Sequence, residues 1–145
     1  MSEQWREVAA EWKGENAFTG HNSRGGTVSM GVSEGEVGPM EMLLLGVAGC
    51  TGMDIVSILT KKREVLTDMR VVVKGKRADT YPMVYTDIEV IYYLWGDQLT
   101  PKAVEQAIQL SEEKYCSASI MLRAIAKFSS SYRLLQPDER LEETV

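Results

Sequence analysis

The sequence predicts an α+β fold. Strand-like alternation fills the first third of the chain, a long apolar helical segment opens at Pro39, and further strands and helices follow. Because these elements are grouped, a regular βαβ repeat is not expected. A chain of 145 residues can bury a core without disulfides or metals. We therefore expect a single domain over residues 1–145, with a flexible acidic tail from about 137 to 145.

The first third predicts short antiparallel strands joined by turns. Polar and apolar residues alternate loosely over Trp5–Trp12 and more regularly over Thr27–Val32. Between them, Gly20–Gly26 is a glycine-rich turn cluster, and Gly35–Gly38 is a second break. This pattern is typical of an antiparallel meander.

A long helix is expected from Pro39 to about Arg63. Proline suits the first turn of a helix, and Glu41 in that turn complements the positive end of the helix dipole. Apolar residues cover nearly its whole circumference, which is typical of a helix surrounded by protein. One domain of this size can hardly surround a helix of this length. We therefore expect a second copy of the chain to supply the missing cover, in a homodimer.

The rest of the chain predicts two long strands, two helices and a last strand. These are expected at Met69–Lys76, at Val84–Trp95, from Pro101 onward, at Ala118–Ala126 and at Lys127–Leu135. Thr100 is expected to cap the first of these helices, with Pro101 in its first position.

Composition argues against several partners. The formal net charge of −5 disfavours nucleic acid. The Met1–Lys13 segment lacks the apolar run of a signal peptide. The longest uncharged apolar stretch, Met42–Met53, is too short to cross a bilayer as a helix. We expect a cytoplasmic protein that binds neither nucleic acid nor membrane.

Two cysteines, Cys50 and Cys116, are the main candidates for chemistry. Two are too few for the disulfide scaffold of a small secreted protein. In a reducing compartment they are core residues, a catalytic pair or metal ligands. The single histidine, His21, argues against zinc, so we expect no metal and no cofactor.

The surroundings of each cysteine leave two interpretations open. Cys50 stands among three helical glycines, which indicate close approach by another backbone or a substrate, or else a small core cysteine at a helix crossing. Cys116 precedes a predicted helix, whose free N–H groups would lower the pKa of its thiol. Alternatively, its thiol merely packs there.

Charged residues supply further candidates. Glu41 lies nine positions before Cys50, on the opposite side of a regular helix, so it could act beside Cys50 only through a helix break or a partner chain. Asp54 shares the face of Cys50 and is expected to find a basic partner or water. Arg24, Arg123 and His21 could accompany a thiolate or an anionic substrate. His21 has no acidic or cysteine neighbour at the sequence spacing of metal ligands, and we interpret it as a loop residue.

Apolar side chains could line a pocket for a lipid-like or aryl substrate, or belong to an ordinary core. This set comprises Met40, Met42, Met53, Tyr92 and Tyr115.

Two segments resemble the OsmC/Ohr family. Residues 38–50, GPMEMLLLGVAGC, are similar to its "SP-x-E-x-LL-x-A-x-G-x-C" helix, and Glu113–Cys116 is similar to its second cysteine segment. The order of elements also matches from about Trp12 to Leu135. The resemblance implies an intertwined α+β homodimer with two active sites at the subunit interface. It also implies thiol-dependent reduction of organic hydroperoxides.

The resemblance implies particular residue roles. Cys50 is similar to the peroxidatic cysteine, Cys116 to the resolving cysteine, and a small or protein dithiol would reduce their disulfide. The substrate implied is a small apolar hydroperoxide. Strongly active members carry an acid directly after the proline, where this chain has Met40, so Glu41 is the candidate acid one position later. Those members also carry an arginine in a Gly-Gly-Arg turn after the first strand. Residues 12–16 contain no equivalent arginine, and the candidate Arg24 does not align with it.

Two other functions stay open beside a thiol peroxidase. One is a non-catalytic or redox-responsive module that binds a small hydrophobic ligand. The other is a dimeric protein whose cysteines only fill the core.

Overall fold

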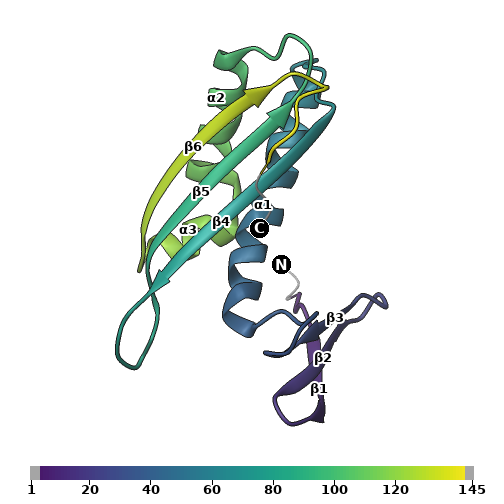
Figure 1. Cartoon of the computed structure of the whole chain (residues 1–145), viewed down its shortest axis with the longest axis vertical. Coiled ribbons are helices and arrows are strands. Elements are labelled where there is room, and N and C mark those ends of the chain that lie inside the picture. The colour runs from purple at the N-terminus through teal and green to yellow at the C-terminus, as the bar shows by residue number, and fades with distance from the viewer. Residues whose placement is uncertain (1–3, 143–145) are drawn as a thin grey trace. The chain divides into compact units, whose positions relative to one another are not determined.

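The computed structural model describes residues 4–142 and divides into two compact units, Met1–Leu43 and Leu44–Val145. Figure 1 colours the chain from its N-terminus to its C-terminus. Residues 143–145 of the expected flexible tail, and residues 1–3 of the Met1–Lys13 segment, lie outside the described part. A single domain with a flexible tail stays a prediction. Within the tail, the backbone carbonyl of Glu139 accepts a hydrogen bond from Trp95 Nε1 at 2.7 Å.

The N-terminal unit contains a three-stranded antiparallel sheet, which confirms the predicted meander. Its strands β1 (Val8–Gly14), β2 (Ala17–Asn22) and β3 (Thr27–Met30) lie in the order β1-β2-β3. The predicted turn at Gly20–Gly26 starts too early, because Gly20 still pairs with residues of both neighbouring strands. A side chain there would crowd Val28, since a Cβ would lie 3.1 Å from its Cγ1.

The turn itself is built around Asn22. Its side-chain oxygen accepts hydrogen bonds from the backbone N–H groups of Arg24 and Gly26, at 2.9 and 2.8 Å. Gly25 has a positive φ of 86°, which glycine adopts without strain. The interpretation of His21 as a loop residue is wrong, because it lies in β2 and its Nε2 pairs with Glu11 Oε1 at 3.0 Å.

The long helix α1 spans Pro39–Lys61, close to the predicted Pro39–Arg63. Glu41 Oε1 accepts a hydrogen bond from the N–H of Gly38 at 2.8 Å, which satisfies a donor at the helix start. At the other end, Arg63 takes a left-handed φ of 61°, and the chain leaves the helix.

The chain by itself buries only one stripe of α1. That stripe consists of Val47, Thr51, Gly52, Ile55 and Leu59. In contrast, Leu45 is 54% exposed and Met53 is 77% exposed. By length and composition α1 could cross a membrane, and 28% of its most apolar stretch is buried. The predicted cover on all sides is therefore not supplied within one described chain.

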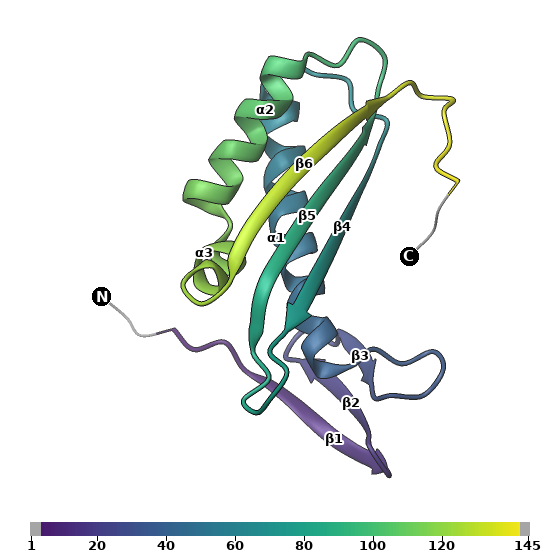
Figure 2. The same ribbon diagram turned by 60° about the vertical axis from the view of Figure 1, so that its left-hand side comes forward.

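The C-terminal unit holds a second three-stranded sheet, of β4 (Asp68–Arg77), β5 (Tyr85–Trp95) and β6 (Lys127–Leu135), in the order β4-β5-β6. Strands β4 and β5 pair antiparallel, whereas β5 and β6 pair parallel. The crossover between β5 and β6 runs through α2 (Pro101–Leu110), a π-helical turn η1 (Ser111–Tyr115) and α3 (Ser117–Arg123). Figures 1 and 2 show the helices on one face of this sheet. The α+β class is confirmed, with one βαβ unit inside it.

The core of this unit lies between the sheet and the helices. On β5 the predicted alternation is observed, since Ile88, Val90, Tyr92 and Leu94 are buried. In the helical layer, Leu59 of α1 and Val104 of α2 are also fully buried. Thr100 is the extended N-cap residue of α2 and Pro101 is the first residue of this helix, as predicted. The Thr100 hydroxyl makes no capping hydrogen bond among the described residues, however, and its own N–H donates to Glu64 Oε1 at 2.7 Å.

Candidate functional site

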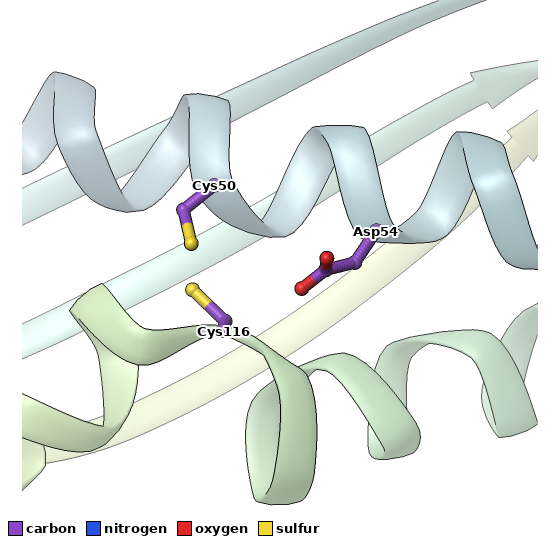
Figure 3. Close-up of side chains that lie close together, drawn as sticks. All are labelled: Cys50, Asp54 and Cys116. Atoms are coloured by element: carbon purple, nitrogen blue, oxygen red, sulfur yellow. The ribbon is translucent and has the colours of Figure 1, made fainter. Parts of the chain in front are cut away.

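The two cysteine sulfurs lie close together inside the C-terminal unit. The sulfurs of Cys50 and Cys116 and a carboxylate oxygen of Asp54 all lie within 4.8 Å of one another. Figure 3 shows both sulfurs and the Asp54 carboxylate turned toward a common space between α1 and the start of α3. Both cysteines are free thiols. The predicted meeting of the sulfurs is therefore formed within one chain, and its position at a dimer interface stays a prediction.

Local backbone geometry brings these residues together. Cys50 and Asp54 stand one helical turn apart on α1, so they share a face. Cys116 comes directly after the π-helical turn, and its N–H donates to the carbonyl of Ser111 at 2.7 Å. Cys116 is extended, with φ −79° and ψ 96°, and forms the N-cap of α3. The wider π turn thus ends the α2–η1 helix at Cys116.

Burial dominates the chemistry of the Cys116 thiol. Its side chain is fully buried, and its sulfur accepts hydrogen bonds from Ser119 N at 3.4 Å and Ser119 Oγ at 3.1 Å. Burial raises the pKa of Cys116, the Ser119 bonds lower it, and the nearby Cys50 raises it again. The predicted lowering of this pKa by the helix start is wrong, because burial outweighs it. Cys116 therefore holds its proton more firmly than an exposed thiol.

Cys50 and Asp54 are both half-buried, so solvent reaches this side of the pair. Asp54 is expected from the sequence to find a basic partner or water. In the described structure a serine hydroxyl binds it, since Ser111 Oγ donates to Asp54 Oδ2 at 3.0 Å. A hydroxyl donor satisfies the carboxylate without adding a positive charge beside the thiols.

A chain of buried hydroxyl groups leads from Asp54 across the core. Ser111 Oγ lies 2.8 Å from Thr51 Oγ1, which lies 3.1 Å from the hydroxyl of Tyr92. Tyr92 donates to Glu112 Oε2 at 2.6 Å. Burial, together with the bond to Glu112, raises the pKa of Tyr92, so this phenol stays protonated. This chain was not predicted from the sequence, although a threonine inside an otherwise apolar helix stretch was a signal for it.

Other predicted site residues make different contacts. Glu41 and Arg24 belong to the N-terminal unit, where Glu41 caps Gly38 and Arg24 is exposed in its turn. Arg123 lies over the ring of Phe128, 5.2 Å from its centroid. Arg123 and Glu112 line the same pocket, of about 370 Å³.

The expected apolar pocket is only partly observed. A groove of about 580 Å³ lies along α1 and β4, lined by Ala48, Gly49, Gly52, Met53, Val56, Ser57, Met69 and Val71. Met53 is its one member from the predicted set. Tyr92 is buried in the hydroxyl chain and Tyr115 is exposed, whereas Met40 and Met42 belong to the N-terminal unit.

Among the described residues, Cys50, Asp54 and Cys116 also form a group whose side-chain atoms could act as metal ligands. Two sulfurs and one carboxylate fall short of the four ligands that close a structural zinc site. Because Cys116 is fully buried and holds its proton, the cluster suits paired-thiol chemistry better than a bound cation.

Known proteins resemble this chain in sequence and in fold. A family described as "OsmC-like protein" matches residues 32–131. Protein YhfA of Escherichia coli (strain K12) is 32% identical over 131 residues, which is 89% of this chain and 98% of that protein. The crystal structure of a hypothetical protein from Aquifex aeolicus VF5 has a TM-score of 0.84 at 35% identity, covering 92% of this chain and 98% of that one.

A solved protein whose name refers to organic hydroperoxide resistance shares the fold at lower identity. The organic hydroperoxide resistance protein OhrB of Bacillus subtilis has a TM-score of 0.60 at 14% identity, covering 90% of this chain and 98% of that one. At this identity the likeness establishes the fold alone.

Proposed function

The chain belongs to the OsmC-like protein family, and on that premise we propose that it reduces organic hydroperoxides with the thiols of Cys50 and Cys116. The observation that carries the proposal is the closeness of these two sulfurs, which come from distant parts of the sequence. The family includes organic hydroperoxide resistance proteins, which supports the reaction class.

Cys50 is the attacking thiol in this proposal. It is half-buried, whereas Cys116 is fully buried. The Cys50 thiolate bonds to one peroxide oxygen, the O–O bond breaks, and the departing alkoxide takes a proton to become an alcohol. Cys50 is then a sulfenic acid.

Cys116 is the resolving thiol. Its sulfur attacks the oxidised Cys50 sulfur, an S–S bond forms, and the hydroxyl group leaves as water after taking a proton. A dithiol reductant then transfers two electrons to the disulfide and restores both thiols. Glu41 and Arg24 remain proposed as the supporting acid and arginine.

A homodimer is part of the proposal. Exposed apolar residues of α1, among them Leu45, Met53 and Val56, form a surface that a second copy would cover. The family resemblance implies a homodimer, and two free thiols suit the reducing cytoplasm. Light scattering should give twice the chain mass, and Met53→Glu should shift it toward one chain. A monomer at micromolar concentration contradicts the dimer.

The test of the activity uses tert-butyl hydroperoxide with dithiothreitol as reductant. We expect Cys50→Ser to abolish peroxide consumption. Cys116→Ser should still form a sulfenic acid, detected by dimedone labelling, but no internal disulfide. Consumption by Cys50→Ser at the wild-type rate refutes the proposal.

A second candidate is a binding or redox-responsive module. The apolar groove of about 580 Å³ favours it, because it offers small and apolar side chains to a hydrophobic ligand. Native mass spectrometry that finds a co-purified apolar molecule, together with no peroxide turnover, supports this candidate over the first.

A further inference from the structure

We propose that Asp54 takes the proton of Cys116 when this thiol attacks oxidised Cys50, and that the hydroxyl chain passes the proton on to Glu112. This inference rests on the proposed function only in taking Cys116 as the resolving thiol. It assigns a role to a buried polar chain that the peroxide reaction itself does not require.

Cys116 needs a base in order to attack. A thiol must lose its proton to become a good nucleophile. Cys116 is fully buried and is held as an acceptor by both donors of Ser119, so bulk water cannot take the proton directly. Asp54 is the carboxylate of the cluster in Figure 3, within 4.8 Å of both sulfurs. That separation allows transfer after a small side-chain movement or through one water.

The series of hydrogen-bonded hydroxyl groups between Asp54 and Glu112 has one hydrogen fewer than it has contacts. Four contacts join the two carboxyl groups, at 3.0, 2.8, 3.1 and 2.6 Å. The three hydroxyl groups between them, those of Ser111, Thr51 and Tyr92, own three hydrogens. With both carboxyl groups ionised, one of the four contacts therefore lacks a hydrogen. A proton that arrives at Asp54 supplies the missing hydrogen, so each of the four contacts then has one. The hydroxyl chain can therefore accept one proton.

A proton on Asp54 can move along this chain to Glu112. When one hydrogen moves across each contact, Asp54 loses the added proton and Glu112 gains one, while every hydroxyl group ends intact. No hydroxyl has to ionise in isolation, which matters because the pKa of Tyr92 is raised by burial. The other oxygen of Glu112 accepts from Ser130 Oγ at 3.1 Å.

The far end of the chain meets solvent. Glu112 is half-buried and lines the open pocket of about 370 Å³ that it shares with the cationic Arg123 and Lys127. A second pocket adds the ionisable groups Glu105, Glu113 and Tyr132 around the same carboxylate. At the other end, Asp54 lies beside the ionisable thiols of Cys50 and Cys116. Glu112 can therefore exchange its proton with water on the side remote from the thiols.

The proton balance closes over one cycle. During resolution the Cys116 S–H bond breaks, its proton enters the chain, the S–S bond forms, and the hydroxyl leaving Cys50 takes a proton from solvent. When a dithiol reduces the disulfide, the departing Cys116 sulfur receives a proton back through Asp54, and the dithiol gives up its two protons to Cys50 and solvent.

The test uses 4,4′-dithiodipyridine, a neutral disulfide, so it needs no peroxide. The half-buried Cys50 releases the first thiopyridone, and Cys116 releases the second when it closes the internal disulfide. We expect Asp54→Asn not to slow the first phase, because loss of a negative charge within 4.8 Å of the Cys50 sulfur favours its thiolate. The second phase should slow by about a hundredfold or more near neutral pH, from the lower end of general-base effects upward. The second-phase rate of Asp54→Asn should then rise about tenfold per pH unit, because without the carboxylate only the ionised fraction of Cys116 attacks, and below the thiol's raised pKa that fraction grows tenfold per unit.

Two further variants examine the route. Tyr92→Phe and Glu112→Gln should slow the second phase by similar factors, and the double variant should be no slower than either. Tyr132→Phe is the matched control, because its hydroxyl donates to Glu105 at 2.6 Å outside the chain, and it should react like the wild type. Circular dichroism verifies that each variant is folded.

An unchanged second phase in Asp54→Asn overturns the proposal, as does a wild-type protein without a second phase. Independent, additive slowing by Tyr92→Phe and Glu112→Gln overturns the route through the chain. If the wild-type protein shows the second phase but does not consume peroxide, the peroxidase function is refuted and the proton route is not.

Discussion

The hydroxyl of Tyr92 should contribute strongly to the stability of the C-terminal unit. Tyr92→Phe removes one oxygen and keeps the ring, which is fully buried in β5. The change therefore tests two hydrogen bonds, to Glu112 at 2.6 Å and to Thr51 at 3.1 Å, with little change in packing.

The expected loss comes from these two bonds. A hydrogen bond to a charged group contributes about 1.5–3 kcal/mol and one between neutral groups about 0.5–1.5 kcal/mol. The sum is about 2–4.5 kcal/mol. The lower half, about 2–3 kcal/mol, is expected because water reaches the half-buried Glu112 through its pocket. With a urea m-value of about 1.5 kcal/mol/M, the midpoint should fall by about 1–2 M.

Urea unfolding monitored by circular dichroism measures this midpoint at equal protein concentrations. Tyr132→Phe removes a Tyr–Glu bond of the same length from a more exposed site, so its midpoint should fall much less. Equal midpoints for the two variants would show that the Tyr92 hydroxyl chain contributes nothing beyond a surface bond.

Three further outcomes are expected. Burial raises the pKa of Cys116 in the folded protein, so as the pH rises past about 9 this thiol ionises first in the unfolded chain. The free energy of unfolding should therefore fall above that pH. The urea midpoint should fall less steeply with pH in Cys116→Ser than in the wild type. Gly75→Ala would place a methyl group 2.5 Å from Tyr85 Cε1 and should destabilise the protein by about 1–3 kcal/mol in calorimetry, and a wild-type value would contradict the crowding. Iodoacetamide should label Cys50 well before the fully buried Cys116, as peptide mass spectrometry can show, and the reverse order would contradict the assigned roles.

Much of the fold could be read from local sequence. Pro39 and the acid at Glu41 located the start of α1, and alternation located β5 and β6 almost to the residue. These features depend on side-chain periodicity and on the backbone preferences of single residues, which a sequence carries directly. The parallel pairing of β6 with β5 does not depend on them, because pairing joins residues far apart in the chain.

The sequence by itself identified the two thiols as the candidate chemistry, because Cys50 stands among three glycines and Cys116 precedes a predicted helix. Only the tertiary structure decided that both sulfurs meet within one chain, that burial raises rather than lowers the pKa of Cys116, and that Asp54 faces a serine. The hydroxyl chain through Thr51 and Tyr92 likewise exists only in the packed core. The physical reason is that proton affinity and hydrogen bonding depend on what surrounds a group in space, whereas local sequence determines only the group's neighbours along the chain.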